Sequence, residues 1–191
     1  MQYSNHFTHA DHDALLKVAL NSIDHGIHHG YPAPIEKTSY SLTLQGNAAA
    51  FVTLRIFDSL RGCIGSLEAV RPLVEDVNEN AYAAAFRDPR FPPLRESEMS
   101  QLRISISVLS SPEPIVCDSE EELLEKLRVG LDGLILEEGR NRGTFLPSVW
   151  ESLPDPHDFL RQLKIKAGLN PDYWSPAIRI YRYQTTSVEY D

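Results

Sequence analysis

Hydrophobic residues recur with two different periods along the chain. Apolar residues at positions 15, 16, 19, 20 and 23 have helical spacing, which predicts a helix over residues 11–29. Residues 102–109 alternate sharply between apolar and polar, which predicts a half-buried strand. Residues 38–44 alternate less strictly and are also predicted to form a strand.

The rest of the chain continues this mixture of helices and strands. Helices are predicted over residues 72–86, 119–128 and 155–168, with a short one over residues 147–153. Strands are predicted over residues 49–57, 60–67, 133–137, 143–146 and 178–188. Because strands and helices do not alternate strictly, we expect an α+β fold with a mainly antiparallel sheet and flanking helices.

The register of the first predicted hairpin decides where its side chains point. With a two-residue turn at Asp58-Ser59, Leu54 faces Cys63, and Cys63 shares the apolar face of the sheet with Arg61. A slip of one residue would reverse this arrangement.

The composition excludes some classes of function. The chain has 191 residues and a formal net charge of -9, which argues against a broad nucleic-acid surface. No apolar run approaches the roughly 18 residues that a membrane span needs. Residues 1–12 are polar and lack the apolar core of a signal peptide, so we expect a cytoplasmic protein. Its two cysteines, Cys63 and Cys117, would stay reduced there.

Cys63 and Arg61 are the first candidates for chemistry. A guanidinium beside a thiol favours the thiolate, so Cys63 is either a nucleophile or a ligand contact that Arg61 activates. In the alternative interpretation, Cys63 is a small buried apolar residue, as free cysteines often are. The assumed register favours the alternative, because burial raises the pKa of a thiol.

An arginine on an apolar strand face requires a partner, because an unpaired buried charge is costly. The partner of Arg61 is either an internal carboxylate, with Asp88 and Glu68 as candidates, or an anionic ligand. Gly62 and Gly65 on the same strand permit close approach of another backbone or of a ligand.

The segment of residues 87–93 is rich in proline and is predicted to be an irregular, stiffened loop. Its charged residues Arg87, Asp88 and Arg90 either bind a ligand or belong to a rigid connector. Tyr82 precedes the loop on the predicted helix, and it either hydrogen-bonds a ligand or packs in the core.

Arg142 lies in a second basic loop, near Arg140 and Thr144. The favoured interpretation is a solvated hairpin tip with alternating charges. In the alternative, Arg142 turns toward Arg61 and helps it to hold an anion.

Histidines gather at positions 6, 9 and 12 and at positions 25, 28 and 29. A zinc site needs three or four ligands in a defined geometry, and neither group has a matching pattern of cysteine or carboxylate. We therefore predict no metal and no cofactor.

Ordered motifs run along nearly the whole chain. They are residues 60–66 (LRGCIGS), 80–94 (NAYAAAFRDPRFPPL), 104–109 (ISISVL), 133–136 (GLIL), 143–150 (GTFLPSVW), 159–160 (FL) and 166–169 (KAGL). Together they resemble the AMMECR-type domain, the A component of the AmmeMemoRadiSam system. The predicted domain covers residues 11–191, and residues 1–10 form a polar, His-rich tail outside it.

The resemblance implies a larger and a smaller lobe, with a cleft that contains the Arg-Gly-Cys strand. In prokaryotic relatives, it implies a genomic association with a Memo-type protein and a radical-SAM protein. It implies no settled activity.

We therefore expect the chain to bind a small anionic or polar molecule in a cleft around Arg61, Cys63 and the loop. In an enzyme, Cys63 would be the nucleophile or acid, Arg61 would set its pKa and hold the substrate, and Asp88 or Tyr82 would orient it. The alternative is a non-catalytic adaptor that binds a Memo-type or radical-SAM partner in the same cleft. The absence of a recognisable catalytic base in the sequence favours this alternative.

Overall fold

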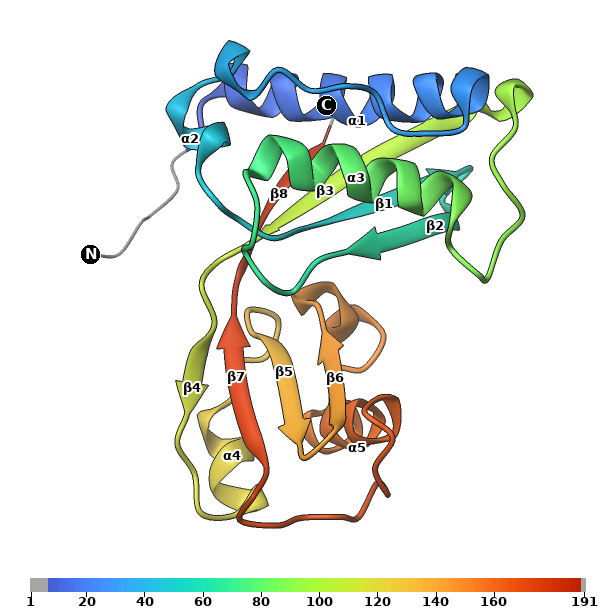
Figure 1. Ribbon diagram of the computed structural model, residues 1–191. Coiled ribbons are helices and arrows are strands. Elements are labelled where there is room, and N and C mark those ends of the chain that lie inside the picture. The colour runs from blue at the N-terminus through green and yellow to red at the C-terminus, as the bar shows by residue number, and fades with distance from the viewer. Residues whose placement is uncertain (1–6, 190–191) are drawn as a thin grey trace. The chain divides into compact units, whose positions relative to one another are not determined.

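The first helix, α1 (His9–His29), begins two residues earlier than predicted because Thr8 caps it. The Thr8 hydroxyl accepts a hydrogen bond from the Asp11 amide, and the Asp11 carboxylate accepts one from the Thr8 amide. The computed structural model describes residues 7–189 (Figure 1). Of the predicted tail, residues 1–6 lie outside the described residues, whereas residues 9 and 10 belong to the helix.

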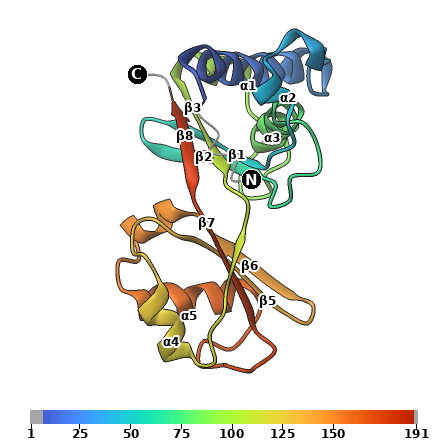
Figure 2. The ribbon, with the colours of Figure 1, turned by 90° about the vertical axis from the view of Figure 1, so that its left-hand side faces the viewer.

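A four-stranded sheet with the order β2-β1-β3-β8 forms the first of two compact units. Its strands are β1 (Ala50–Ile56), β2 (Ser59–Gly65), β3 (Leu102–Leu109) and β8 (Thr185–Glu189). Helices α1 and α3 (Leu73–Phe86) pack on one face of this sheet (Figure 2), where they bury Val52, Leu54, Ile106 and Val188. The alternate residues, among them Thr53, Arg55, Arg103 and Ser105, form the opposite face, which we name the polar face.

The turn of the β1–β2 hairpin lies one residue earlier than predicted. Its central residues are Phe57 and Asp58, with positive φ angles of 48° and 62°, as in the two-residue turns that match the twist of paired strands. This shift alone would pair Cys63 with Val52, which lies on the same face as Leu54.

A bulge interrupts the pairing next to Cys63. Leu60 and Gly62 pair with adjacent residues of β1, so Arg61 is an extra residue on β2. The extra residue pairs Cys63 with Thr53, which moves the Cys63 side chain to the polar face. The prediction that both lie on the apolar face with Leu54 is wrong.

Residues 38–44 do not form the predicted strand. They contribute to a short 3-10 helix, η1 (Lys37–Ser39), and to α2 (Leu42–Gln45). Ser41 caps α2, because its hydroxyl accepts a hydrogen bond from a backbone amide of the helix and donates one to Asp11 of α1. Capping by this serine outweighs the weak alternation.

The second unit, residues 110–185, contains an antiparallel sheet with the order β4-β7-β5-β6. Its elements are β4 (Glu113–Ile115), α4 (Glu120–Lys126), β5 (Gly133–Glu138), β6 (Asn141–Phe145), η3 (Pro147–Glu151), α5 (Pro156–Lys166) and β7 (Arg179–Tyr183). Leu134 and Leu136 of β5 pack in its core with Leu123 of α4 and Phe159 of α5. All of these elements except β4 were predicted, with small differences in their ends.

The strand predicted over residues 178–188 is two strands. β7 ends at Tyr183 and β8 begins at Thr185, and the two belong to different sheets. Alternation indicates that both segments are extended, but it does not identify the strand with which each one pairs.

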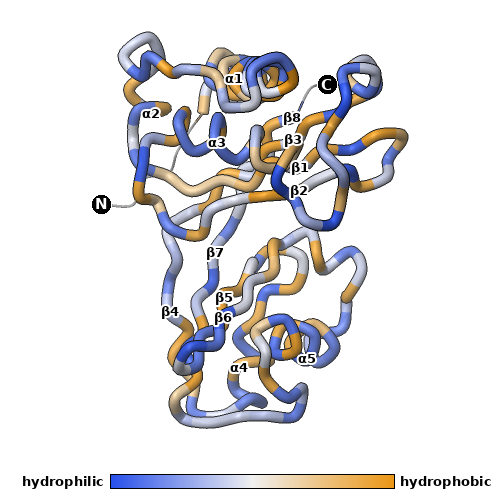
Figure 3. Tube along the Cα trace, turned by 45° about the vertical axis from the view of Figure 1, so that its right-hand side comes forward, coloured by the Kyte–Doolittle hydropathy of each residue, from blue (hydrophilic) through white to orange (hydrophobic). Residues whose placement is uncertain are grey.

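The α+β class with antiparallel sheets is confirmed, with a larger and a smaller unit. Figure 3 shows both hydrophobic and hydrophilic residues on α1, as expected of a helix that covers one face of a sheet. Within residues 7–189, no helix is long and apolar enough to cross a membrane.

Candidate functional site

Cys63 lies in a row of three polar side chains on the polar face of the first sheet. It pairs with Thr53 of β1, which in turn pairs with Ser105 of β3. Directly opposed residues on antiparallel strands point to the same face, so the thiol and the two hydroxyls are neighbours. The half-buried Cys63 Sγ lies 3.3 Å from the Thr53 Oγ1. We name these three residues the thiol–hydroxyl row.

Asp88 and Arg90 hold the backbone of Cys63 at the outer edge of β2. The Asp88 Oδ2 accepts a hydrogen bond of 2.9 Å from the Cys63 amide, and the Arg90 Nη2 donates one of 3.2 Å to the Cys63 carbonyl. β2 is the end strand of its sheet, so these backbone groups would otherwise lack a strand partner. The loop between α3 and β3 takes the place of that partner.

The carboxylate of Asp88 is almost completely buried but well hydrogen-bonded. Arg90 donates to it from Nε at 2.9 Å and from Nη2 at 2.6 Å, a paired geometry typical of guanidinium and carboxylate groups. These bonds hold the pKa of Asp88 well below its usual range, although burial acts in the opposite direction. Asp88 and Arg90, which we predicted as ligand contacts, position Cys63 in this structure.

Replacing Asp88 by asparagine is expected to destabilise the first unit by about 2 kcal/mol at neutral pH, because hydrogen bonds to charged groups contribute about 1.5–3 kcal/mol. The half-exposed Arg90 adds little beyond these bonds, since solvent screens its charge. The folded-state pKa of Asp88 is lowered, so its stabilisation is present above the unfolded pKa of about 3.9. The stabilisation is lost as the pH falls through the folded-state value.

Urea denaturation near neutral pH and at about pH 3 measures this contribution. The difference between wild type and Asp88→Asn should shrink at the lower pH. Asp13→Asn, at an exposed position of α1, is the control for loss of one carboxylate. Equal stability of Asp88→Asn and wild type at neutral pH would contradict the positioning role.

Arg61 pairs with Glu98, and the prediction of Asp88 or Glu68 as its internal partner is wrong. Its Nε and Nη2 donate to the two carboxylate oxygens of Glu98 at 2.7 and 3.1 Å. Glu98 lies in η2 (Glu96–Gln101), and these bonds lower the pKa of its carboxyl group. The remaining nitrogen of Arg61, Nη1, is buried and has no hydrogen-bond partner within residues 7–189. An unpaired buried donor of this kind costs free energy.

Gly62 and Gly65 allow close packing within the first unit. A Cβ at Gly62 would lie 2.1 Å from the Ala84 carbonyl oxygen of α3, and a Cβ at Gly65 would lie 2.2 Å from the Phe51 ring. Both glycines were candidates for ligand contact. Protein atoms occupy the space beside each of them.

Tyr82 and Arg87 pack against each other on the helix side of the first unit. The buried Tyr82 donates from its hydroxyl to the Gly30 carbonyl at 2.5 Å. The Arg87 guanidinium lies 4.9 Å from the centroid of the Tyr82 ring. Tyr82 thus links α3 to the end of α1, which matches the packing interpretation of this residue.

Arg142 lies in the second unit, on β6, directly opposite Glu137 of β5. The two side chains form an ion pair of 3.1 Å. Opposite charges at directly opposed positions stabilise a hairpin by a few tenths of a kcal/mol. This contact fits the interpretation of a hairpin with alternating charges.

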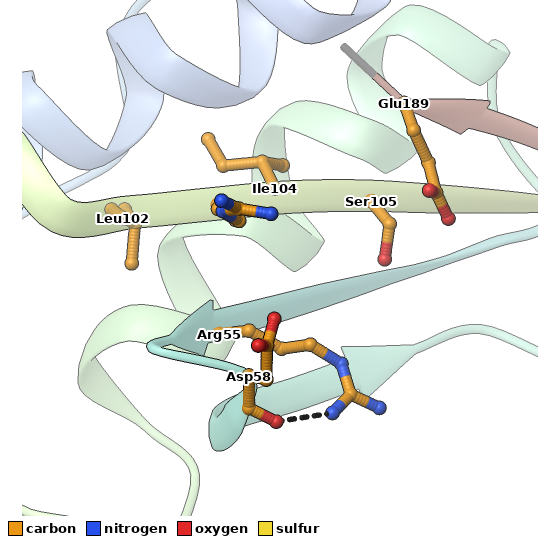
Figure 4. A pocket seen from close by; sticks show the side chains of 7 residues that line it. Arg55, Asp58, Leu102, Ile104, Ser105 and Glu189 are labelled. Atoms are coloured by element: carbon orange, nitrogen blue, oxygen red, sulfur yellow. Dashed lines mark hydrogen bonds between the residues drawn. The ribbon is translucent and has the colours of Figure 1, made fainter. Parts of the chain in front are cut away.

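An open pocket of about 530 Å³ adjoins the thiol–hydroxyl row on the polar face (Figure 4). Its lining residues are Arg55, Asp58, Leu102, Arg103, Ile104, Ser105 and Glu189. Ser105 belongs to both the pocket and the row, so a molecule in the pocket would reach the row. Sequence reasoning missed this pocket, although the alternation of residues 102–109 had already assigned Arg103 and Ser105 to one face.

A buried hydrogen-bond network around Asp76 was also missed. Its fully buried carboxylate accepts hydrogen bonds from the Ala50 amide at 2.9 Å, the Ser66 hydroxyl at 2.7 Å, the Arg71 Nε at 2.8 Å and the Asn80 Nδ2 at 2.9 Å. The network ties the start of β1 and the end of β2 to α3. In the sequence, Asp76 stands out only as an acidic residue in the first turn of a helix, where a negative charge is favourable.

Among the described residues, no group of three or more His, Cys, Asp or Glu side chains is placed to hold a metal ion. The histidines at the end of α1 pack on one another, with the ring centroids of His25 and His29 4.2 Å apart.

Comparisons with known proteins agree on one family. The family model described as AMMECR1 matches residues 16–188. Protein MK0488 of Methanopyrus kandleri is 38% identical over 184 residues, which are 92% of this chain and 86% of that protein. Protein MJ0810 of Methanocaldococcus jannaschii is 40% identical over 159 residues, which are 79% of this chain and 77% of that protein.

A solved structure is similar as well. The crystal structure of the uncharacterized protein PH0010 from Pyrococcus horikoshii has a TM-score of 0.83 and 35% sequence identity to this chain. The match covers 91% of this chain and 88% of that one. At this level of similarity, the two chains share their fold.

Proposed function

The chain belongs to the AMMECR1 family, and from that premise we propose that it binds a small polar or anionic molecule on the polar face of the first sheet, beside Cys63. The observation that carries this proposal is the thiol–hydroxyl row next to an open pocket. A thiol and two hydroxyls offer several weak donors and acceptors to one ligand. Binding sites commonly combine a hollow with a few such convergent polar groups.

The local structure fixes the row in position. Asp88 and Arg90 hold the Cys63 backbone from outside the sheet, and the strand pairing fixes Thr53 and Ser105. A binding group held by rigid strands loses little conformational entropy when a ligand arrives. This rigidity supports binding at the sheet face.

Binding has more support than catalysis by Cys63. Within residues 7–189, the hydrogen-bond partner of its Sγ is the Thr53 hydroxyl, which is not a base at neutral pH. Asp88 uses its oxygens on the Cys63 amide and on Arg90. A nucleophilic thiol needs a neighbouring base or cation to form the thiolate. Arg90 is a nearby cation, but it is paired with the Asp88 carboxylate, which offsets its charge. The proposal therefore gives Cys63 the role of a ligand contact.

Alkylation of Cys63 tests this proposal. In a Cys117→Ala background, iodoacetamide should modify Cys63 in the folded protein, because the side chain is partly exposed. A small carboxylate or phosphate that occupies the pocket should slow this reaction. Ser105→Ala should weaken the protection, whereas Ser110→Ala, at an exposed position outside the pocket, should leave it unchanged. Modification of Cys63 that requires denaturant would refute the proposal.

A non-catalytic adaptor is the second candidate, and one observation favours it. Phe57, at the tip of the β1–β2 hairpin, is 77% exposed and has a positive φ of 48°, which is unfavourable for a bulky residue. An exposed aromatic side chain on a strained turn is suited to contact with a protein. The partner would be a Memo-type or radical-SAM protein in the cytoplasm, and a thiol that reacts slowly in the folded state would favour this candidate.

A further inference from the structure

We infer that Arg55 and Arg103 form an anion subsite in the pocket on the polar face, and that it takes the phosphate, or an equivalent doubly charged oxyanion, of a small molecule. The inference rests on the proposed function, because the subsite would hold one end of the same ligand. Neither arginine was a candidate from the sequence.

The two arginines lie where their positive charges repel each other. Arg55 of β1 and Arg103 of β3 are directly opposed in the strand register, so two positive charges lie side by side on one sheet face. Like charges at directly opposed positions destabilise a sheet. Within residues 7–189, neither arginine forms an ion pair that would offset this repulsion. A bound dianion between the guanidinium groups would offset it.

A hydrogen bond within the pocket restrains one of the two arginines. The Arg55 Nη1 donates to the Asp58 carbonyl at 2.8 Å, which restrains a side chain that would otherwise move freely in solvent (Figure 4). The other nitrogens of this guanidinium remain available to the pocket. Guanidinium groups on neighbouring strands are each able to donate paired hydrogen bonds to the oxygens of a phosphate monoester.

The negative charges around the arginines disfavour a large polyanionic ligand. Asp58 and Glu189 also line the pocket, and the whole chain has a net charge of -9. These charges repel an extended polyanion such as a nucleic acid. A small molecule would place its phosphate at the arginines and its remaining polar groups at Ser105, at the end of the thiol–hydroxyl row.

Phosphorus NMR with phenyl phosphate as the probe tests the subsite, with phenol added as an uncharged competitor. Wild type should shift and broaden the phosphate signal, and an excess of phenol should not reverse this change. Arg55→Gln and Arg103→Gln should each weaken phenyl phosphate binding roughly ten- to a hundredfold. Arg140→Gln removes one exposed positive charge from the second unit and should bind like wild type.

Melting temperatures show whether a variant loses phosphate binding because its fold is destabilised. Each pocket variant removes one of two repelling charges, so its melting temperature should equal or exceed that of wild type. Phenyl phosphate should raise the melting temperature of wild type and have little effect on either pocket variant. Equal weakening in Arg103→Gln and Arg140→Gln would overturn the subsite, since it would reflect net charge alone.

Protection of Cys63 from iodoacetamide separates this inference from the proposed function. Protection by phenyl phosphate that persists in Arg55→Gln and Arg103→Gln would refute the subsite and leave the proposed function intact. Arginine-dependent phosphate binding without any protection of Cys63 would support the subsite and refute the proposed role of Cys63. Protection that is lost in both pocket variants would support both.

Discussion

Replacing Asp76 by alanine is expected to lower the free energy of unfolding of the first unit by about 3–5 kcal/mol. The carboxylate is fully buried and accepts hydrogen bonds from four donors, one of which is the Arg71 guanidinium. Alanine would leave the buried Ala50 amide and Asn80 side chain without this acceptor, and unpaired buried donors are costly. The effect would be large against the 5–15 kcal/mol by which a typical domain is stable.

Equilibrium denaturation in urea, followed by circular dichroism, measures the loss. Glu75→Ala is the matched control, because Glu75 precedes Asp76 in the same helical turn but is partly exposed. The control should cost at most about 1 kcal/mol through its interaction with the helix dipole. If Asp76→Ala costs no more than Glu75→Ala, the network does not hold α3 to the sheet.

Replacing Gly62 by alanine is expected to destabilise the first unit by about 3 kcal/mol, at the upper end of the cost of overpacking. The added methyl group would lie 2.1 Å from the Ala84 carbonyl oxygen, which belongs to the backbone of α3 and cannot rotate away. Either α3 or β2 must move. Since Gly62 is next to Cys63, movement of β2 should also change the rate at which iodoacetamide modifies Cys63.

Gly46→Ala is the control for this substitution. A Cβ at Gly46 would meet its nearest atom at 3.4 Å, and its φ of -68° suits alanine. This variant should be as stable as wild type and should show the same alkylation rate. Wild-type stability and an unchanged Cys63 rate in Gly62→Ala would show that β2 and α3 are not in close contact at this glycine.

The helices and most strands of this chain could be predicted because their patterns are local. The spacing of apolar residues in α1 and the alternation in β3 each repeat over several turns or residues. The register of the β1–β2 hairpin could not be predicted. The sequence signal favoured a turn at Asp58-Ser59, whereas the structure has Phe57 with positive φ, a conformation that bulky residues rarely adopt.

The candidate site was predictable in part for the same reason. Cys63 and the charged loop after α3 stand out in the sequence, and the structure brings Asp88 and Arg90 to the Cys63 backbone. The partner of Arg61 is 37 residues away in a short 3-10 helix, and no local pattern indicates it. The opposition of Arg55 and Arg103 depends on strand pairing, which alternation leaves open.

The division of residues 178–188 between two sheets has a consequence for synthesis of the chain. The first unit is interrupted after Leu109 and regains its fourth strand, β8, at Thr185–Glu189. The ribosome therefore completes the whole second unit before it supplies the last strand of the first. Until then, β3 has an open edge that is able to pair with another chain. The second unit, by contrast, is one continuous segment, so all of its strands are synthesised before the last strand of the first unit.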